Sequence, residues 1–224
     1  MSVSLAIQES SSSRDRILDV AEWLFARRGF NGVGLREVAD QAGLGKSSLF
    51  HHFQTKSELY CQVILRTLER IRAHVQPALD SDGTAAGRLD RVVDALIDAL
   101  VGDPPSARLL LRSMFEDEML PESAHELPEH KAAECETESM LSDFGMLIRE
   151  GIDSGVFRRV SVPHTIQSLI GAIVFHFASG ELGEKLIHSE LLAPEAVAAR
   201  RREVKDLLRH GMVAEDSATA GEKK

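Results

Sequence analysis

Hydrophobic and polar positions alternate with a helical period through residues 35–53, LREVADQAGLGKSSLFHHF. Apolar residues recur three and four positions apart on either side of Gly43, whose backbone freedom suits a sharp turn. The apolar positions are Leu35, Val38, Ala39 and Ala42 before the turn, and Leu49 and Phe53 after it. Two short helices joined by a tight turn are therefore predicted, which is the layout of a helix-turn-helix.

The same period predicts an all-α fold of about nine helices. The first helix spans about 14–28, and Thr55 with Glu58 can form a capping box at the start of a fourth helix. Pro77 is expected to end that helix near residue 76. The remaining helices are expected at about 84–101, 104–116, 128–154, 162–180 and 194–210.

Four segments follow from this pattern. Residues 1–13, which are Ser-rich and aperiodic, and residues 213–224 are expected to be disordered tails. Residues 14–60 should form the helix-turn-helix domain, with the fourth helix continuing to about 76. Residues 61–212 should form a helical regulatory and dimerisation domain.

The helix expected at 162–180 is apolar on nearly every face, and a helix that is apolar all round is buried all round. Because one chain can cover only one such face, a homodimer through this helix and the helix at 194–210 is predicted. The residues expected at the dimer interface are Leu169, Ile173, Phe177, Val197, Val204 and Leu208.

Composition changes this picture little, since the 224 residues are 43% hydrophobic and 27% charged, as in an ordinary globular protein. The net charge of −9 lies outside the helix-turn-helix segment, because residues 1–60 carry seven basic and seven acidic side chains. Cys61 and Cys135 fit no zinc or redox spacing. With no leader pattern and no membrane-length apolar stretch, a cytoplasmic protein without membrane partners is expected.

The second helix of the motif turns short polar and cationic side chains outward, which suits phosphate and base-edge contacts in the DNA major groove. The segment 14–60 resembles the TetR family of transcriptional regulators. The matching residues are Ile17, Ala21, Leu24, Phe25, Gly29, Phe30, Leu35, Arg36, Val38, Ala39, Ala42, Gly43, Leu44, Lys46, Leu49, His52, Phe53, Lys56 and Leu59. Gly34 and Phe50 depart from the family's usual Ser/Thr cap and Tyr. The resemblance implies contacts to double-stranded DNA by Arg36, Lys46, Ser47, Ser48, Phe50, His51 and Lys56.

The resemblance also implies a small-molecule effector in a cavity between helices of the second domain. Met and Phe side chains would suit an apolar effector, although the same side chains are equally typical of a plain core. The expected ligand contacts are Leu110, Met114, Phe115, Met140, Phe144, Leu147, Phe175 and His176. His176 stands alone in an apolar helix, so it is either a core histidine or the polar contact of the ligand.

Metal binding and catalysis lack comparable patterns. His125, His130, Glu134 and Cys135 are close in sequence but contain no i, i+4 histidine pair and no H-E-x-x-H motif. The acidic run at 116–118 is typical of a solvated face. No phosphate loop, nucleophile elbow or paired-carboxylate motif is found in the sequence, so no enzyme activity, no cofactor and no metal are expected.

These patterns favour a ligand-responsive transcriptional regulator. By resemblance it is a repressor that binds a palindromic operator as a homodimer and is released by a small, mostly apolar effector. Two alternatives remain. One is a helical small-molecule-binding or partner-binding dimer without specific DNA binding, and the other is a metal-sensing regulator whose His and Cys residues converge in space.

Overall fold

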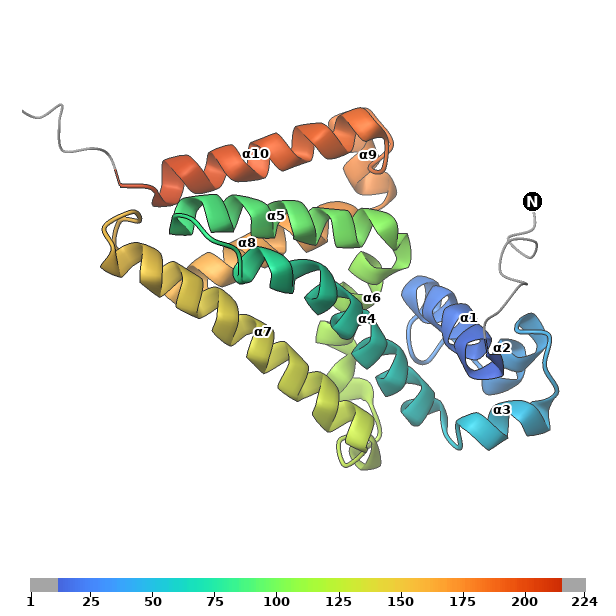
Figure 1. Ribbon diagram of the computed structural model, residues 1–224. Helices are drawn as coiled ribbons and strands as arrows, with labels where there is room; N and C mark the ends of the chain where they lie inside the picture. Colours follow the sequence, from blue (N-terminus) through green and yellow to red (C-terminus); the bar gives the residue numbers. More distant parts are fainter. Residues whose placement is uncertain (1–11, 215–224) are drawn as a thin grey trace, which may run out of the picture. The chain divides into compact units, whose positions relative to one another are not determined.

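A computed structural model describes residues 12–214 (Figure 1). Within these residues the helices are α1 (Ser13–Arg28), α2 (Leu35–Gln41), α3 (Lys46–His52), α4 (Lys56–Leu79), α5 (Ala85–Gly102), α6 (Pro104–Glu116), α7 (Pro128–Asp153), α8 (Val162–Ala178), α9 (Glu181–Ile187) and α10 (Pro194–Met212), with 3-10 turns η2 (Asp117–Met119) and η3 (Glu122–Ala124). The predicted all-α fold is confirmed. No helix in this described range is long and apolar enough to span a membrane.

The described helices group into two compact units. The first unit comprises the chain up to Ile71 together with Gly102–Glu138, and the second comprises Arg72–Val101 and the chain from Ser139 onward. The division falls inside α4 and α7, so each of these helices contributes residues to both units. The boundary predicted after residue 60 separates the helix-turn-helix segment from the regulatory segment, and it stays a prediction.

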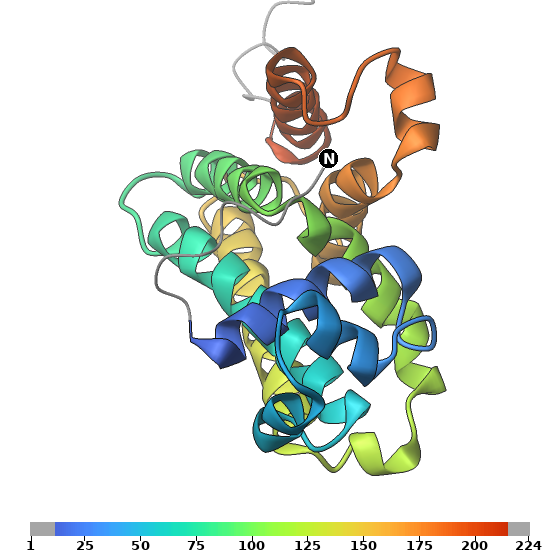
Figure 2. The same cartoon turned by 90° about the vertical axis from the view of Figure 1, so that its right-hand side faces the viewer.

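Capping and turn chemistry account for the short helices of the first unit, which Figure 2 shows in blue. Ser12 and Asp15 form a capping box at the start of α1. Gly43, at φ +67°, makes the turn between α2 and α3. Glu58 donates its backbone N–H to Thr55 Oγ1 at 3.1 Å. The carboxylate of Glu58 accepts from the N–H of Gln54, so the predicted capping box is only half formed.

Three boundaries differ from those predicted. α4 continues past Pro77 to Leu79, because proline keeps a helical φ and so near a helix end costs only one backbone hydrogen bond. The unpredicted helix α9 follows Gly180, which at φ +57° separates it from α8. In the predicted C-terminal tail, Ala214 N–H donates to Val156 O at 3.0 Å. The rest of the predicted tails, 1–11 and 215–224, lies outside the described residues.

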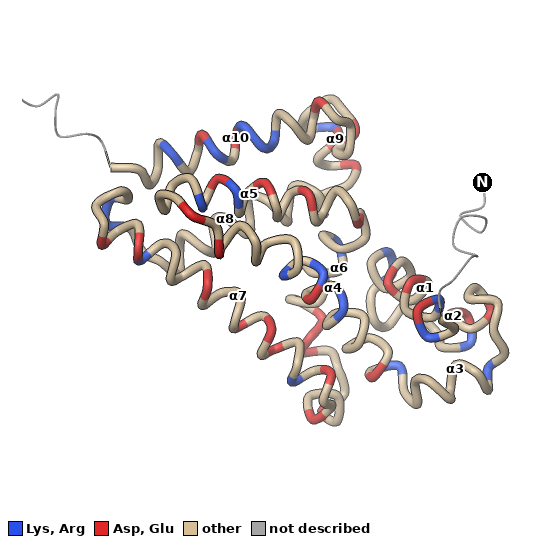
Figure 3. Tube along the Cα trace, in the orientation of Figure 1, with Lys and Arg blue, Asp and Glu red and all other residues tan. Residues whose placement is uncertain are grey.

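In the second unit, ion pairs attach α10 to α5. Arg201 contacts Asp94 at 2.9 Å and Asp98 at 2.6 Å, and Lys205 contacts Asp94 at 2.6 Å. Figure 3 shows the basic residues of α10 beside the acidic residues of α5. This row of charges fixes which side of α10 turns toward α5.

Candidate functional site

α3 presents a mixed polar and aromatic face to solvent. Lys46, Ser47 and His51 are exposed, Ser48 is half-buried, and Phe50 is 38% exposed. The opposite side of the helix packs into the core of the first unit. The exposed face therefore offers two hydroxyls, an ammonium and an imidazole to a polyanion or to base edges.

Two lysines predicted to contact DNA lie over aromatic rings. Lys46 Nζ is 5.4 Å from the centroid of the Phe50 ring, and Lys56 Nζ is 4.3 Å from that of Phe30. A cation–π contact of this kind restrains an ammonium without neutralising its charge. Arg36 is exposed on α2. All three cations are thus available to a phosphate, and their DNA contacts stay a prediction.

The inner side of α3 is fixed to α1. His52 Nε2 lies 2.7 Å from Ser13 Oγ, and the Arg14 guanidinium lies 5.3 Å from the centroid of the Phe53 ring. His52 therefore belongs to the packing of the motif rather than to its exposed face. These contacts set the orientation in which α3 presents its outer side chains.

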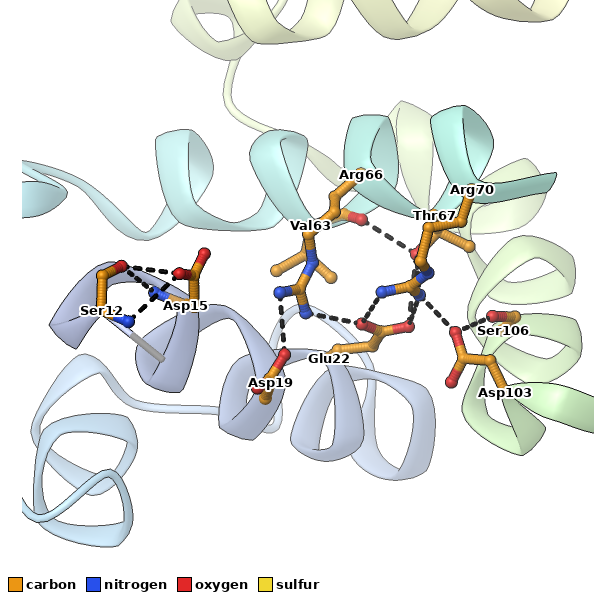
Figure 4. Close-up of polar contacts among 10 residues, drawn as sticks. All are labelled: Ser12, Asp15, Asp19, Glu22, Val63, Arg66, Thr67, Arg70, Asp103 and Ser106. Atoms are coloured by element: carbon orange, nitrogen blue, oxygen red, sulfur yellow. Dashed lines mark hydrogen bonds and ion pairs between the residues drawn. The ribbon is translucent and has the colours of Figure 1, made fainter. Parts of the chain in front are cut away.

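A buried carboxylate ties α1 to α4 and α6 (Figure 4). Glu22 is 4% exposed, and it accepts from Arg66 Nη2 at 2.8 Å and from Arg70 Nη1 at 3.1 Å. Arg70 also pairs with Asp103, which precedes α6. Figure 4 shows both guanidinium groups directed at Glu22 from α4. Because buried charges are stable only when paired, the three helices depend on one another at this point.

Burial and charge shift the pKa values of this cluster. Burial alone would raise the pKa of Glu22, but the hydrogen bond and charge of Arg70 and the charge of Arg66 hold it below its ordinary value. Burial raises the pKa of Asp103, a hydrogen bond from Ser106 opposes that rise, and the charge of Glu22 adds to it. Glu22 is therefore the carboxylate that the arginines keep ionised.

The C-terminal end of α6 caps the C-terminal end of α1. Arg112 donates from Nε to Ala26 O at 3.1 Å and from Nη2 to Arg27 O at 3.2 Å. Glu116 Oε2 accepts the N–H of Phe30 at 2.9 Å, just after α1 ends. These bonds satisfy backbone groups that a helix end leaves unpaired.

The predicted effector contacts are distributed over both units. Leu110, Met114 and Phe115 belong to the first unit, and the other five residues belong to the second. Met114 and Phe115 are 67% and 71% exposed, and Phe175 is 54% exposed. These three side chains therefore lie on the surface of the chain, whereas Phe144 is buried. The exposed positions are not those of an enclosed apolar wall.

His176 is the predicted effector contact with the most unusual surroundings. Its Nε2 atom is buried and has no hydrogen-bond partner among the described residues. Burial lowers the pKa of His176 to about 4, with a smaller contribution from the charge of Arg200. The imidazole is therefore neutral near pH 7 and keeps an unused hydrogen-bonding site.

A pocket of about 490 Å³ lies in the second unit, lined by α8, α10 and residues 158–161. Its lining includes three of the predicted interface residues, Leu169, Val204 and Leu208. Ile173 and Phe177 are only 1% and 8% exposed and do not line it. The single chain therefore covers both side chains, as it covers Leu169 and Val204, and the predicted interface residues stay a prediction. The sixth predicted residue, Val197, is half-buried on α10.

Sequence analysis missed several residues that the fold brings together. Asp117 lies beside His125 and His130, with ligating atoms of all three within 4.8 Å of one another. No sequence spacing links Asp117 to the histidines, and its acidic run resembles a solvated surface.

Cys61 is set apart chemically, because burial, aided by the charges of Glu129 and Asp117, raises the pKa of its thiol to about 12. In the absence of a bound metal, the Cys61 thiol is therefore protonated near pH 7.

Two family models match the chain. Residues 17–63 match bacterial regulatory proteins of the tetR family, and residues 86–208 match the tetracyclin repressor-like C-terminal domain. Together these models cover both the segment that contains α3 and the helices α5 to α10. The second match alone spans more than half of the chain.

Named relatives and a solved structure resemble the chain as well. The HTH-type transcriptional activator FasR of Mycolicibacterium smegmatis is 32% identical over 102 residues, which are 46% of this chain and 47% of FasR. The chain thus spans about half the length of FasR. The HTH-type transcriptional repressor KstR2 of the same organism is 26% identical over 150 residues, 67% of this chain and 70% of KstR2. The structure of the ketosteroid transcriptional regulator KstR2 of Mycobacterium tuberculosis has a TM-score of 0.73 at 20% identity, covering 92% of this chain and 98% of that one.

Proposed function

Because this chain belongs to the tetR family of bacterial regulatory proteins, with that family's DNA-binding helix-turn-helix, we propose that it is a ligand-responsive transcriptional repressor. It binds a palindromic operator as a homodimer and leaves it when a small, mostly apolar effector binds. The exposed Lys46–His51 face of α3 is the observation that carries this proposal. Of the two relatives, KstR2 is named a repressor and FasR an activator. Deleting the gene should therefore raise transcription beside the operator, and a fall would make the protein an activator.

The neutral charge of the helix-turn-helix segment favours sequence-specific over non-specific DNA binding. Residues 1–60 are electrically neutral as a whole, so attraction to phosphate is modest and discrimination rests on the side chains of α3. A two-fold protein matches a two-fold operator, with the recognition helices about 34–36 Å apart or a multiple of that spacing. The short hydroxyls of Ser47 and Ser48 suit hydrogen bonds to phosphate or base edges.

The surface of the second unit supports the homodimer. The pocket of about 490 Å³ beside α8 and α10 has a largely apolar lining. Exposed apolar side chains lie on the same helices, with Phe175 on α8 54% exposed and Leu207 on α10 64% exposed. Leu182 and Leu186 are further exposed apolar side chains, on α9, at 67% and 79% exposure. A second copy of the chain would bury these groups in an isologous interface.

His176 supports a small effector with one polar group. A buried imidazole nitrogen without a partner costs free energy, and a ligand hydroxyl or carbonyl would supply the missing hydrogen bond. Its ring lies edge-on to that of Phe177, with the ring centroids 4.8 Å apart, and the predicted contacts Phe144 and Leu147 are buried, at 4% and 2% exposure. An effector that is mostly apolar fits this composition.

The experiment that tests the proposal is selection of bound duplexes from a random or genomic library at low salt. A palindromic site should be enriched. Lys56→Ala should weaken binding to all sequences, and it should reduce the slope of log affinity against log salt concentration by about 1. Ser48→Ala should instead change the base preference at particular operator positions. Lys185→Ala, which removes an exposed lysine of α9, is the control and should change neither the affinity for DNA nor the base preference. Recovery of no enriched site would reject specific DNA binding in favour of a helical binding protein.

A further inference from the structure

Three possible metal ligands converge after α6, within the first unit. Asp117 begins η2, His125 follows η3, and His130 lies in the first turn of α7. His130 Nε2 is 3.0 Å from Asp117 Oδ1 and 3.2 Å from His125 Nδ1. His130 is only 7% exposed. The three donor atoms therefore meet at a point that is partly shielded from water.

Hydrogen bonding around His130 is incomplete in a way that points to a cation. A neutral imidazole has one N–H and one acceptor nitrogen. Nδ1 of His130 is buried without a hydrogen-bond partner and lies 3.5 Å from Glu134 Oε2, while Nε2 faces the carboxylate of Asp117. In the neutral ring, whichever nitrogen bears the hydrogen, the other directs its lone pair at a carboxylate, and a cation on that nitrogen, either a second proton or a metal ion, relieves the repulsion. Without such a cation, the lone pair of a buried imidazole nitrogen facing a carboxylate is unfavourable.

A metal ion on Nε2 removes this conflict, because Nδ1–H can then donate to Glu134. Histidine ligands of metals characteristically donate their second nitrogen to a carboxylate in this manner. Two imidazole nitrogens and one carboxylate oxygen are ligands that zinc accepts, and three protein ligands leave a fourth position open. Acidic residues recur through the loop before α7 and along its first turns, which favours a cation there (Figure 3).

We propose that Asp117, His125 and His130 bind one divalent transition-metal ion of the zinc class, with Glu134 positioning His130. The fourth ligand is water or a small-molecule donor. This site lies entirely within the first unit, and it is independent of whether the chain binds DNA.

The ion would stabilise the junction between α6 and α1. Glu116, the neighbour of Asp117, accepts the backbone N–H of Phe30 at 2.9 Å and the hydroxyl of Tyr60 at 3.3 Å. An ion that holds Asp117 also limits the movement of Glu116. Zinc should therefore raise the thermal stability of the chain, because a ligand that binds only the folded state stabilises it.

The test uses the full-length chain after treatment with a chelator and dialysis. Zn²⁺ binding is measured by calorimetry, and Co²⁺ serves as a visible-absorption probe of the coordination geometry. One ion per chain is expected. Asp117→Asn and His125→Ala should abolish binding and the thermal shift caused by zinc. Glu134→Gln should keep the stoichiometry but weaken affinity by about 10- to 100-fold.

Two controls keep the proposal falsifiable. His164→Ala removes an exposed histidine of α8, and Cys135→Ser removes an exposed thiol next to Glu134, and both should bind metal as wild type does. The side chains of Asp117 and Glu134 are 53% and 61% exposed, so their variants should keep the helical circular dichroism spectrum. Absence of a 1:1 complex overturns the proposal. Binding that survives Asp117→Asn, or that is lost in Cys135→Ser, overturns the assigned ligands.

Discussion

At the scale of single residues, Gly29 and Gly43 both have a positive φ, but a side chain would clash with neighbouring atoms only at position 29. Gly29 follows α1 at φ +72° and ψ 177°, a region of backbone space that is essentially reserved for glycine. A Cβ atom there would lie 2.1 Å from Glu116 Oε1. Gly43 has a similar φ of +67°, yet a Cβ at that position would meet nothing within 4 Å. The glycine at position 29 thus serves both the turn and the junction of α1 with α6.

We expect Gly43→Ala to lower the free energy of unfolding by about 1–2 kcal/mol, the cost of placing a side chain in the left-handed region. Gly29→Ala should cost more, because strain of about 1–3 kcal/mol is joined by displacement of Glu116 from the Phe30 N–H. Urea unfolding of the two variants compares these losses directly. Equal losses would mean that Glu116 moves aside freely and does not hold this junction.

His176 predicts a pH dependence of stability whose sign follows from its lowered pKa. The pKa is about 4 in the folded chain, compared with 6.5 for an ordinary histidine. Between these values the unfolded state binds a proton that the folded state does not. The contribution of His176 to stability is therefore complete above pH 6.5 and is lost as the pH falls toward 4.

His176→Phe keeps a ring of similar size but removes this titration. The Tm of the variant should fall less than that of wild type between pH 8 and pH 5, measured by calorimetry in matched ionic strength. His210→Phe, at an exposed position of α10, is the matched control and should follow wild type. Parallel curves for His176→Phe and wild type would show that the imidazole is protonated as readily in the folded chain as in the unfolded one.

Sequence analysis predicts residues in a local pattern better than residues brought together by folding. The exposed positions of α3 follow from the spacing of Leu49 and Phe53, which are buried as that spacing requires. Glu22 occupies the apolar side of α1, four positions after Leu18, which is a visible sign of a buried partner. Its arginine partners lie more than 40 residues away, and no local pattern identifies them.

At the scale of helices, α1 is held against α4 by the ion pairs of buried Glu22 as well as by apolar contacts. We expect Glu22→Gln to cost about 3 kcal/mol, because it leaves Arg66 and Arg70 without a buried carboxylate between them. Asp19→Asn removes the more exposed partner of Arg66 and should cost at most about 1 kcal/mol. Chemical unfolding measures both losses. A similar cost for the two variants would place the stabilisation in apolar packing rather than in the buried charge.

The boundaries of long amphipathic helices are well predicted, whereas the partners of apolar faces are not. α6 spans the predicted residues because Pro104 and Pro105 fix its first turn. α8 is apolar nearly all round, and its sequence does not distinguish the face that the chain covers from the face left open. The fold resolves this ambiguity, since Ile173 and Phe177 turn inward while Phe175 is 54% exposed.

The exposed apolar side chains of α8 and α10 allow a sharper test of dimerisation. Phe175→Asp and Leu207→Asp place charge on exposed apolar positions, so each should yield a folded monomer in sedimentation experiments at micromolar concentration. An obligate dimer interface commonly buries about 2,000 Å² or more, and a charge at its centre is strongly unfavourable. Met146→Asp, at a 55% exposed apolar position of α7, is the matched control and should remain dimeric. A monomeric wild-type protein would refute the dimer itself, and dimeric Phe175→Asp and Leu207→Asp would refute this location.

At the scale of the whole molecule, effector response requires communication between α3 and the helices that receive the ligand. α4 and α7 each contribute residues to both compact units, so a change in one unit has a covalent and helical path into the other. A ligand shifts such an equilibrium only by its preference for one state over the other. The proposed effector must therefore bind the DNA-free state more tightly than the operator-bound state.

Thermodynamic reciprocity makes that requirement measurable. Couplings of this kind typically amount to about 1–3 kcal/mol, so an effector should weaken operator binding by about 5- to 150-fold. Operator DNA must weaken effector binding by the same factor. A small apolar compound that raises the Tm of the chain would be titrated by calorimetry with and without a saturating operator duplex. His176→Phe should reduce its affinity in both titrations if His176 is its polar contact. Equal wild-type affinities in the two titrations would show that the bound compound does not control DNA binding.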